Sequence, residues 1–470
     1  MLLRFAPFVA VAALACSGCG ARTSLEDARR CDASAVEVCD GVDNDCDGEV
    51  DEDIPPVTCG ELGCAVTVRC EDGKMPACVP RQPAPEACNL ADDDCDGQVD
   101  EGFGIGPLGP ASVLRSTENE TGACTSCYWA FDTVIAPSPP GFVVLWRLGV
   151  YGGEEQPSLF GRRVDRFGAP VGAVVPWTSD VVMSMRPVPV IAPGPPGGVP
   201  LTAVYRNGSS EQSGFVFLDE TGATDFVPTN PGLRNYPATV WTGERFVTAW
   251  EEDDTLRVAV STADGVEERL VDVDPLERPG AITLGVFPGR VGVLVSRYRE
   301  PETRDQWFIE LDATGNVIAP AKQIDVAYTT WQRLVGTPEG WLHIRPNGFE
   351  EPSTRQALAE TGEPLGPATP FEDGRHLQDS GLQDLFVPWP GSDEIFSAWQ
   401  DPSGGDMHVE VLDPRGNVRR GWSGPTGNPD GMFVDPHFVR ADDRIVMVWH
   451  GGSPDSTPNF VMTQSFGCTP

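Results

Sequence analysis

Positive charge is scarce in this 470-residue chain. Its 33 Lys and Arg stand against 70 Asp and Glu, and only Lys74 and Lys322 are lysines, so the formal net charge is −37. Binding to nucleic acid or to an anionic membrane surface depends on Lys and Arg that neutralise phosphates. The composition therefore argues against both as partners.

Long apolar runs are missing as well. The apolar stretch FAPFVAVAALA at 5–15 is too short to span a bilayer, and it leads into ALAC and SGC as an export signal does. ALAC resembles the lipobox of bacterial lipoproteins, in which the cysteine is acylated. The resemblance implies a lipoprotein-type signal peptide at 1–16, a tether at 17–30 and a lipid anchor at Cys16. Cys19 is an alternative anchor, because cleavage there leaves an even number of cysteines, and an ordinary secretory signal is a third interpretation.

Catalytic signatures are absent from the sequence. The motifs H-E-x-x-H, G-x-S-x-G and S-x-x-K and the phosphate-binding loop do not occur. The histidines are scattered through the second half of the chain, and each alone is more typical of a structural or solvated side chain than of a catalytic one. They are His343, His376, His408, His437 and His450. The sequence predicts a protein that is not an enzyme.

What is abundant is cysteine and acid near the N-terminus. Nine of the 14 cysteines lie between Cys31 and Cys95, and residues 26–103 hold 22 acidic against 5 basic side chains. A short cysteine-dense segment behind an export signal indicates a disulfide framework and an oxidising compartment. We expect a small, loop-dominated, Asp-rich module at 31–103.

This module contains one motif twice, CDGVDNDCDGEVDE at 39–52 and CNLADDDCDGQVDE at 88–101, and residues 37–52 and 86–101 are identical at 10 of 16 positions. Alternating Asp in a tightly turning loop brings carboxylates to one point, Gly permits the bend, and an inward Val (Val50, Val99) anchors the loop. These features predict two oxygen-rich Ca²⁺ sites. The expected ligands are Asp43, Asp45, Asp47, Glu49, Asp51 and Glu52 in the first loop, and Asp92, Asp94, Asp96, Gln98, Asp100 and Glu101 in the second, with Glu49 and Gln98 offering their carbonyls.

The loops depart from an EF-hand. The twelfth position, where an EF-hand has a bidentate Glu, holds Ile54 or Phe103. Acid at the ninth position resembles the Ca²⁺ loops of thrombospondin type 3 repeats. Without the bidentate ligand we expect weak, structural Ca²⁺ binding, at roughly 10⁻⁴–10⁻³ M, and Mg²⁺ is less suited because it keeps several waters. An acidic disulfide knot with no bound ion is the alternative.

The whole pattern resembles the MopE-type metal-binding motif of bacterial secreted and surface proteins. The resemblance covers 31–103 and implies nothing about 105–470. The family name evokes copper, but the module has neither His nor Trp, since the first of each are His343 and Trp129. Copper is therefore disfavoured on ligand softness.

The cysteines inside the loops, Cys46 and Cys95, lie between ligand positions. Pairing with Cys39 and Cys88, seven residues earlier, would staple each loop, and other connectivities stay open. The nine cysteines of the module leave one without a partner. Cys468 could pair with it, because closure of a propeller would bring the C-terminus near residues 104–115. Cys124 and Cys127 predict a local disulfide, because a redox site would need a strand–helix context.

Residues 105–470 carry a repeat that predicts a mainly β protein. An apolar segment ending near an aromatic recurs about every 45–60 residues, at 142–146, 200–205, 246–250, 291–296, 341–344, 395–399 and 445–449. Turns shaped like D-x-x-G follow six of them, at 165–168, 219–222, 262–265, 312–315, 359–362 and 413–416. Four short strands per repeat predict a β-propeller of seven blades, with six as the alternative, whose Trp and Phe markers form core. The last repeat lacks its outer strand, which LGPASVLR at 108–115 is expected to supply.

Together these features predict an exported, lipid-anchored protein of the outer membrane or cell surface. Two structural calcium loops would precede a propeller that binds a surface glycan or protein, with membrane contact only through the lipid. The alternative is a carbohydrate-active propeller enzyme, a glycoside hydrolase or a lyase, which would need convergent polar residues with perturbed pKa values at its mouth.

Overall fold

The computed structural model describes part of the chain. The described residues are 36–45, 48–52, 54–60, 64–116, 129–138, 140–149, 158–176, 182–187, 199–207, 210–219, 222–223, 227–228, 238–252, 255–263, 267–273, 279–287, 289–299, 303–327, 332–347, 351–371, 386–388, 392–400, 406–425, 427, 434–441, 444–451 and 460–469. The chain divides into two compact units, Met1–Glu61 with Ala65–Arg81, and Leu62–Cys64 with Gln82–Pro470. The expected signal peptide, tether and anchor cysteines, Cys16 and Cys19, lie outside the described residues.

Within its described residues, the small unit has two disulfides and one short hairpin. Strand β1 (Val57–Cys59) pairs antiparallel with β2 (Val66–Val68). The disulfides join Cys39 to Cys70 and Cys59 to Cys78. Cross-links of this kind stabilise a segment that is too polar and too short to bury a large core.

The large unit consists of antiparallel sheets. Within the described residues it has seven sheets of four or five strands and no helix. The first three sheets contain β5 (Trp129–Ser138), β6 (Gly141–Gly149), β7 (Ser158–Val164) and β8 (Pro170–Pro176); β9 (Val182–Pro187), β10 (Val199–Asn207), β11 (Ser210–Asp219), β12 (Gly222–Ala223) and β13 (Val227–Pro228); and β14 (Ala238–Trp241), β15 (Phe246–Glu252), β16 (Thr255–Ser261) and β17 (Glu267–Val273).

The next three sheets contain β18 (Pro279–Phe287), β19 (Arg290–Arg299), β20 (Thr303–Asp312) and β21 (Val317–Ala327); β22 (Arg333–Thr337), β23 (Gly340–Asn347), β24 (Glu351–Leu358) and β25 (Thr369–Pro370); and β26 (Phe386–Pro388), β27 (Ile395–Gln400), β28 (Met407–Leu412) and β29 (Val418–Gly424). The last sheet combines β3 (Gly104–Pro107) and β4 (Ser112–Ser116) with β30 (Val434–Ala441), β31 (Arg444–Gly451) and β32 (Phe460–Thr469). Consecutive strands pair in each sheet, as four-strand repeats predict.

The apolar segments of the repeat form the second strand of each sheet, β6, β10, β15, β19, β23, β27 and β31. In β6 the side chains are buried on both faces of the strand, since Val144, Leu145 and Trp146 are each 0 % exposed. A strand covered on both faces reads as a continuous apolar run. Trp250 and Trp449 are buried in the same way, so the prediction that these markers form core is confirmed.

The D-x-x-G turns join the third strand to the fourth. In the turn at 413–416, Asp413 Oδ1 accepts hydrogen bonds from the backbone N–H groups of Arg415 and Asn417, at 2.9 and 2.8 Å. The turns at 165–168 and 312–315 have the same bonds. The turn at 413–416 also contacts the preceding sheet, where Arg355 of β24 donates to the carbonyl of Gly416 at 2.7 Å. The turn at 165–168 contacts the last sheet, where Thr463 of β32 donates to the carbonyl of Gly168. The predicted hairpins are confirmed at these positions, and they pack neighbouring sheets together.

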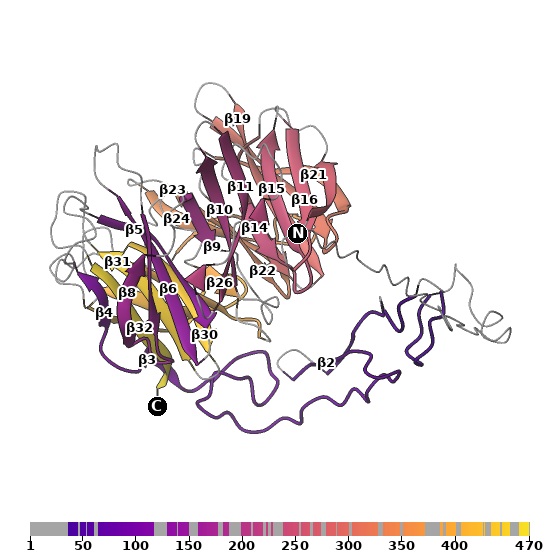
Figure 1. Cartoon of the computed structure of the whole chain (residues 1–470), viewed down its shortest axis with the longest axis horizontal. Coiled ribbons are helices and arrows are strands. Elements are labelled where there is room, and N and C mark those ends of the chain that lie inside the picture. Colours follow the sequence, from indigo (N-terminus) through magenta and orange to yellow (C-terminus); the bar gives the residue numbers. More distant parts are fainter. Residues whose placement is uncertain are drawn as a thin grey trace, which may run out of the picture. The chain divides into compact units, whose positions relative to one another are not determined.

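The last sheet closes with residues from both ends of the large unit. β4 pairs with β32, and Val461 lies opposite Arg115, as predicted for 108–115. β3 pairs with the other end of β32, so the indigo-purple strands β3 and β4 lie beside the yellow β32 (Figure 1). β5 of the first sheet contacts β30 and β31 of the last sheet. This arrangement is compatible with propeller-like repeats.

Among the described residues, the structure has no helix long and apolar enough to cross a membrane.

Candidate metal centre

The described residues of the two acidic loops have matching backbone features, with equivalent residues 49 positions apart. Gly48 and Gly97 have φ values of +102° and +93°, which glycine adopts without strain. Asp51 and Asp100 are also left-handed, at +60° and +50°, a conformation that Asp tolerates better than most residues. The repeated motif therefore encodes a repeated structure.

A glutamate just before each loop organises its backbone. Glu37 Oε1 accepts from the N–H groups of Asn44 and Asp45 at 2.6 and 2.9 Å, and Oε2 accepts from that of Asp51 at 3.0 Å. Glu86 accepts from the equivalent amides, those of Asp93, Asp94 and Asp100, at 2.6, 3.0 and 2.7 Å. Neither glutamate is among the ligands predicted from the sequence. The signal was present, because Glu occupies this position in both copies.

Each glutamate lies within an acidic trio. Glu37, Asp45 and Glu52 each offer a carboxylate oxygen, and these oxygens lie within 4.8 Å of one another. In the second loop the same holds for Glu86, Asp94 and Glu101, and also for Asp92, Asp94 and Asp96. Of the expected ligands, Asp45, Glu52, Asp92, Asp94, Asp96 and Glu101 are thus brought together with acidic neighbours. Converging carboxylates are what a hard divalent cation requires.

Several of the predicted ligands, including Asp92 from a trio of the second loop, accept hydrogen bonds from the loop backbone. Asp51 accepts from the amides of Asp40 and Gly41, and Asp100 accepts from those of Asn89 and Leu90. Asp43 and Asp92 accept from the turn amides at Gly48 and Gly97, at 3.1 and 2.8 Å. These carboxylates hold the shape that brings the trios together.

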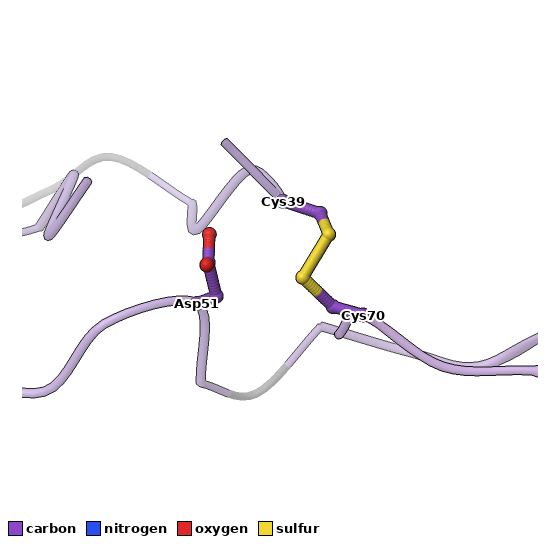
Figure 2. Close-up of side chains that lie close together, drawn as sticks. All are labelled: Cys39, Asp51 and Cys70. Carbon is purple, nitrogen blue, oxygen red and sulfur yellow. A yellow bond between two sulfur atoms is a disulfide. The ribbon is translucent and has the colours of Figure 1, made fainter. Parts of the chain in front are cut away.

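Asp51 also lies near two sulfur atoms. Figure 2 shows its carboxylate beside Cys39 and Cys70, whose Sγ atoms are joined in a disulfide. A cysteine binds a metal ion as a thiolate, and Cys39 and Cys70 are joined in a disulfide. Of these three residues, only Asp51 therefore offers a ligand atom.

Glu49 and Gln98 are expected to bind through their backbone carbonyls, and their side chains are not part of the acidic trios. Gln98 is half-buried, and its side-chain amide donates to Asp96 Oδ2 at 2.9 Å. Glu49 is exposed. Asp47 and Cys46 of the first loop, and the pair Cys124 and Cys127, lie outside the described residues.

The second loop carries negative charge that is partly withdrawn from water. Burial raises the pKa of Asp92 and of Asp100. The pKa of Glu101 is raised, first by burial and further by the charges of Glu86 and Asp94. Glu101 Oε2 is buried and accepts no hydrogen bond from the described residues. A cation among these oxygens would offset both the repulsion and the lost hydration.

The second loop packs into the large unit, whereas the Val of the first loop is exposed. Val99 and Leu90 are each 2 % exposed, and they join a buried cluster with residues of β27, β28, β31 and β32. Val50, the equivalent of Val99, is 55 % exposed. The predicted inward Val is confirmed for Val99 and wrong for Val50. The first loop also carries Gly41 at the position of the buried Leu90.

The predicted staples within each loop are wrong. Cys39 pairs with Cys70, Cys95 with Cys64, and Cys88 with Cys468. The carboxylate–amide hydrogen bonds described above hold the shape of each loop. The disulfides instead connect the loops to other segments of the chain. The prediction that Cys468 pairs with a cysteine of the module is confirmed. Disulfides of this number indicate an extracellular or periplasmic protein.

His343 lies in the core of the large unit. It is 0 % exposed in β23, where its ring contacts Gln332, and burial lowers its pKa to about 3. A histidine that stays neutral in this way is structural in character, as its core-strand position suggested.

Comparison with known proteins supports the motif. The family model Cu-binding MopE, described as "Putative metal-binding motif", matches residues 29–52 and 81–101. No curated protein matches the chain.

Solved structures with similarity to the chain include two neuraminidase-like proteins from influenza viruses of bats. A subtype N10 neuraminidase-like protein of A/little yellow-shouldered bat/Guatemala/060/2010 is 10 % identical, with 62 % of this chain and 99 % of that chain covered and a TM-score of 0.38. A subtype N11 neuraminidase-like protein of A/flat-faced bat/Peru/033/2010 (H18N11) is 11 % identical, with 78 % and 94 % covered and a TM-score of 0.41.

Proposed function

We propose that this protein is an exported surface protein whose two acidic loops each hold a structural Ca²⁺ ion. Glu37, Asp45 and Glu52 would bind one ion, and Glu86, Asp94 and Glu101 the other. The observation that carries the proposal is that both loops bring the same Glu–Asp–Glu trio within 4.8 Å on a backbone of the same shape.

The donor chemistry favours calcium over softer metals. Each trio consists of carboxylate oxygens, with no imidazole or thiolate. Ca²⁺ binds six to eight oxygen ligands, and waters can supply some of them. In the second loop Asp92 and Asp96 lie close enough to contribute. When bound, the ion would supply positive charge to a segment that has little of its own.

The large unit is proposed to be a seven-bladed β-propeller that binds a surface glycan or protein and catalyses no reaction. Its support is the set of four-strand meanders, the turns that pack onto the preceding sheet, and the last sheet built from both ends of the unit. A lipid at Cys16 would tether the protein to the outer membrane or cell surface, and the disulfides fit such a location.

Two experiments test this function. Equilibrium dialysis of the full-length protein against Ca²⁺, Mg²⁺, Zn²⁺ or Cu²⁺ should find about two Ca²⁺ per chain at millimolar concentration. Preferential retention of copper or zinc would reject the calcium assignment. A glycan and surface-protein array with the full chain should find a bound ligand that is released unchanged, and turnover of that ligand would reject the non-enzymatic role.

A further inference from the structure

We infer that the second acidic loop is a clasp on the large unit, so that cation binding in this loop and closure of the last sheet form one equilibrium. The first loop has no such effect. This inference rests on the cation binding proposed above and adds a consequence that only one of the two sites has.

The apolar side of the second loop is part of the large unit's core. Leu90, Val99 and Ile105 are 2, 2 and 5 % exposed and belong to one cluster. Their neighbours in that cluster include Phe396 of β27, Met407 of β28, Trp449 of β31 and Phe466 of β32. Removing the loop from its seat would expose this cluster to water, which costs free energy in proportion to the apolar area.

The loop is also joined to the last strand of the chain. Cys88, at its start, is disulfide-bonded to Cys468 in β32, across 380 residues of sequence. Directly after the loop, β3 pairs with the same end of β32, with Ile105 opposite Cys468. β4 then pairs with the first half of β32. The strands that complete the last sheet therefore follow the loop without a break.

Polar contacts fix the metal-binding part of the loop to the neighbouring sheet. The N–H group of Asp393 donates to the carbonyl of Gly97 at 3.0 Å, and Gly97 is the turn glycine whose own amide is held by Asp92. Arg420, which pairs with Glu394 at 2.7 Å, also exerts its charge on Asp100. The turn that brings the carboxylates together is thus the turn that touches β26–β29.

Coupling follows from this arrangement. The turn at Gly97 is bonded both to Asp92 and to Asp393. Seating therefore restrains the backbone that brings Glu86, Asp94 and Glu101 together, and a cation binds the closed state better than an opened one. A ligand that prefers one state stabilises it by mass action. The first loop lacks both features, the buried Val and the disulfide to β32, because Val50 is exposed and the disulfide of Cys39 ends at Cys70 within the small unit.

The test compares Glu101→Gln with its equivalent, Glu52→Gln, in the full-length protein. Calcium binding is measured by titration calorimetry, unfolding of the large unit by scanning calorimetry, and opening of β32 by hydrogen exchange. At roughly ten times the Kd, Ca²⁺ should raise the melting temperature of the large unit by about 2 °C and slow exchange in β32. E101Q should lose both effects, and E52Q should keep both.

The outcomes are distinguishable. If wild type binds two Ca²⁺ but neither melting nor exchange in β32 responds, or if E52Q abolishes the response as E101Q does, the clasp is rejected and the proposed calcium function stands. If neither loop binds Ca²⁺, the proposed function fails and the clasp with it. Should E101Q not fold, Asp94→Asn paired with Asp45→Asn provides the same comparison.

Discussion

The glutamates that precede the loops, Glu37 and Glu86, have two tasks. Each accepts hydrogen bonds from three backbone N–H groups and also places a carboxylate oxygen within the acidic trio. Hydrogen bonds to an ionised acceptor contribute about 1.5–3 kcal/mol each, more than neutral ones. The residue that shapes the loop is therefore one of the residues that would bind the ion.

Replacing Glu86 by Gln should show both tasks. The new NH₂ group cannot accept an amide hydrogen, so the large unit should lose about 2 kcal/mol of unfolding free energy without any cation. The Ca²⁺ affinity of the second loop should fall by at least about tenfold, because one anionic ligand becomes neutral. Urea unfolding and calorimetric titration measure the two effects. Glu71→Gln, an exposed acid outside the loops, is the control and should change neither.

Glu394 gives the seat of the second loop a pH dependence. Burial raises its pKa from 4.5 to about 7, although Arg420 and Arg419 lower it. The folded state therefore binds a proton that the unfolded state has released between pH 4.5 and 7, and the unfolding free energy falls as pH rises through this window. Glu394→Gln should remove this fall, by up to roughly 3 kcal/mol. Urea unfolding of both proteins from pH 4 to 8 tests the shift, and parallel pH curves would contradict it. Any titration of His343 cancels in the difference.

At the scale of elements, the D-x-x-G hairpins were predictable because their chemistry is local. Asp413 binds amides two and four residues ahead, and Gly416 supplies a φ of +80°. The packing of each turn on the preceding sheet was not predictable, because it joins residues far apart, such as Arg355 and Gly416.

Two glycines in turns of the β18–β21 sheet distinguish the backbone strain of the turn from its packing against the neighbouring sheet. Gly315 and Gly289 both have a φ of +78°, but a Cβ at Gly315 would lie 2.5 Å from Val260 Cγ2, whereas one at Gly289 would meet nothing within 4 Å. Gly289→Ala should cost about 1–2 kcal/mol from backbone strain alone. Gly315→Ala should cost about 1–3 kcal/mol more, because it also presses on the neighbouring sheet. Chemical denaturation measures both, and equal losses would mean that the turn does not pack tightly.

At the scale of the molecule, the repeat and its closure were predictable from sequence. The segment 108–115 resembled the outer strands that the last repeat lacks, and β4 indeed completes the sheet of β32. Cys468 could be expected near the module for the same reason, since closure brings the chain ends together.

The remaining cysteine pairs and the seat of the second loop were not predictable. Spacing suggested Cys39 with Cys46, but pairing depends on which segments fold against each other, and Cys39 meets Cys70. The two loops look equivalent in sequence, yet one difference, Gly41 against Leu90, accompanies exposure of Val50 and burial of Val99. Because of this seat, a fragment ending at residue 103 would remove the second loop from its partners, so binding is best measured on the full chain.

Each acidic loop is proposed to bind one hard cation. Calorimetric titration of the chelator-treated full-length protein with Ca²⁺ tests it most directly, beside the double variant Glu52→Gln, Glu101→Gln. We expect two ions per chain with a Kd of roughly 10⁻⁴–10⁻³ M, weaker binding of Mg²⁺, and at least about a tenfold loss of affinity at both sites in the double variant. Absence of Ca²⁺ binding at millimolar concentration, or binding that the double variant leaves unchanged, would contradict the account.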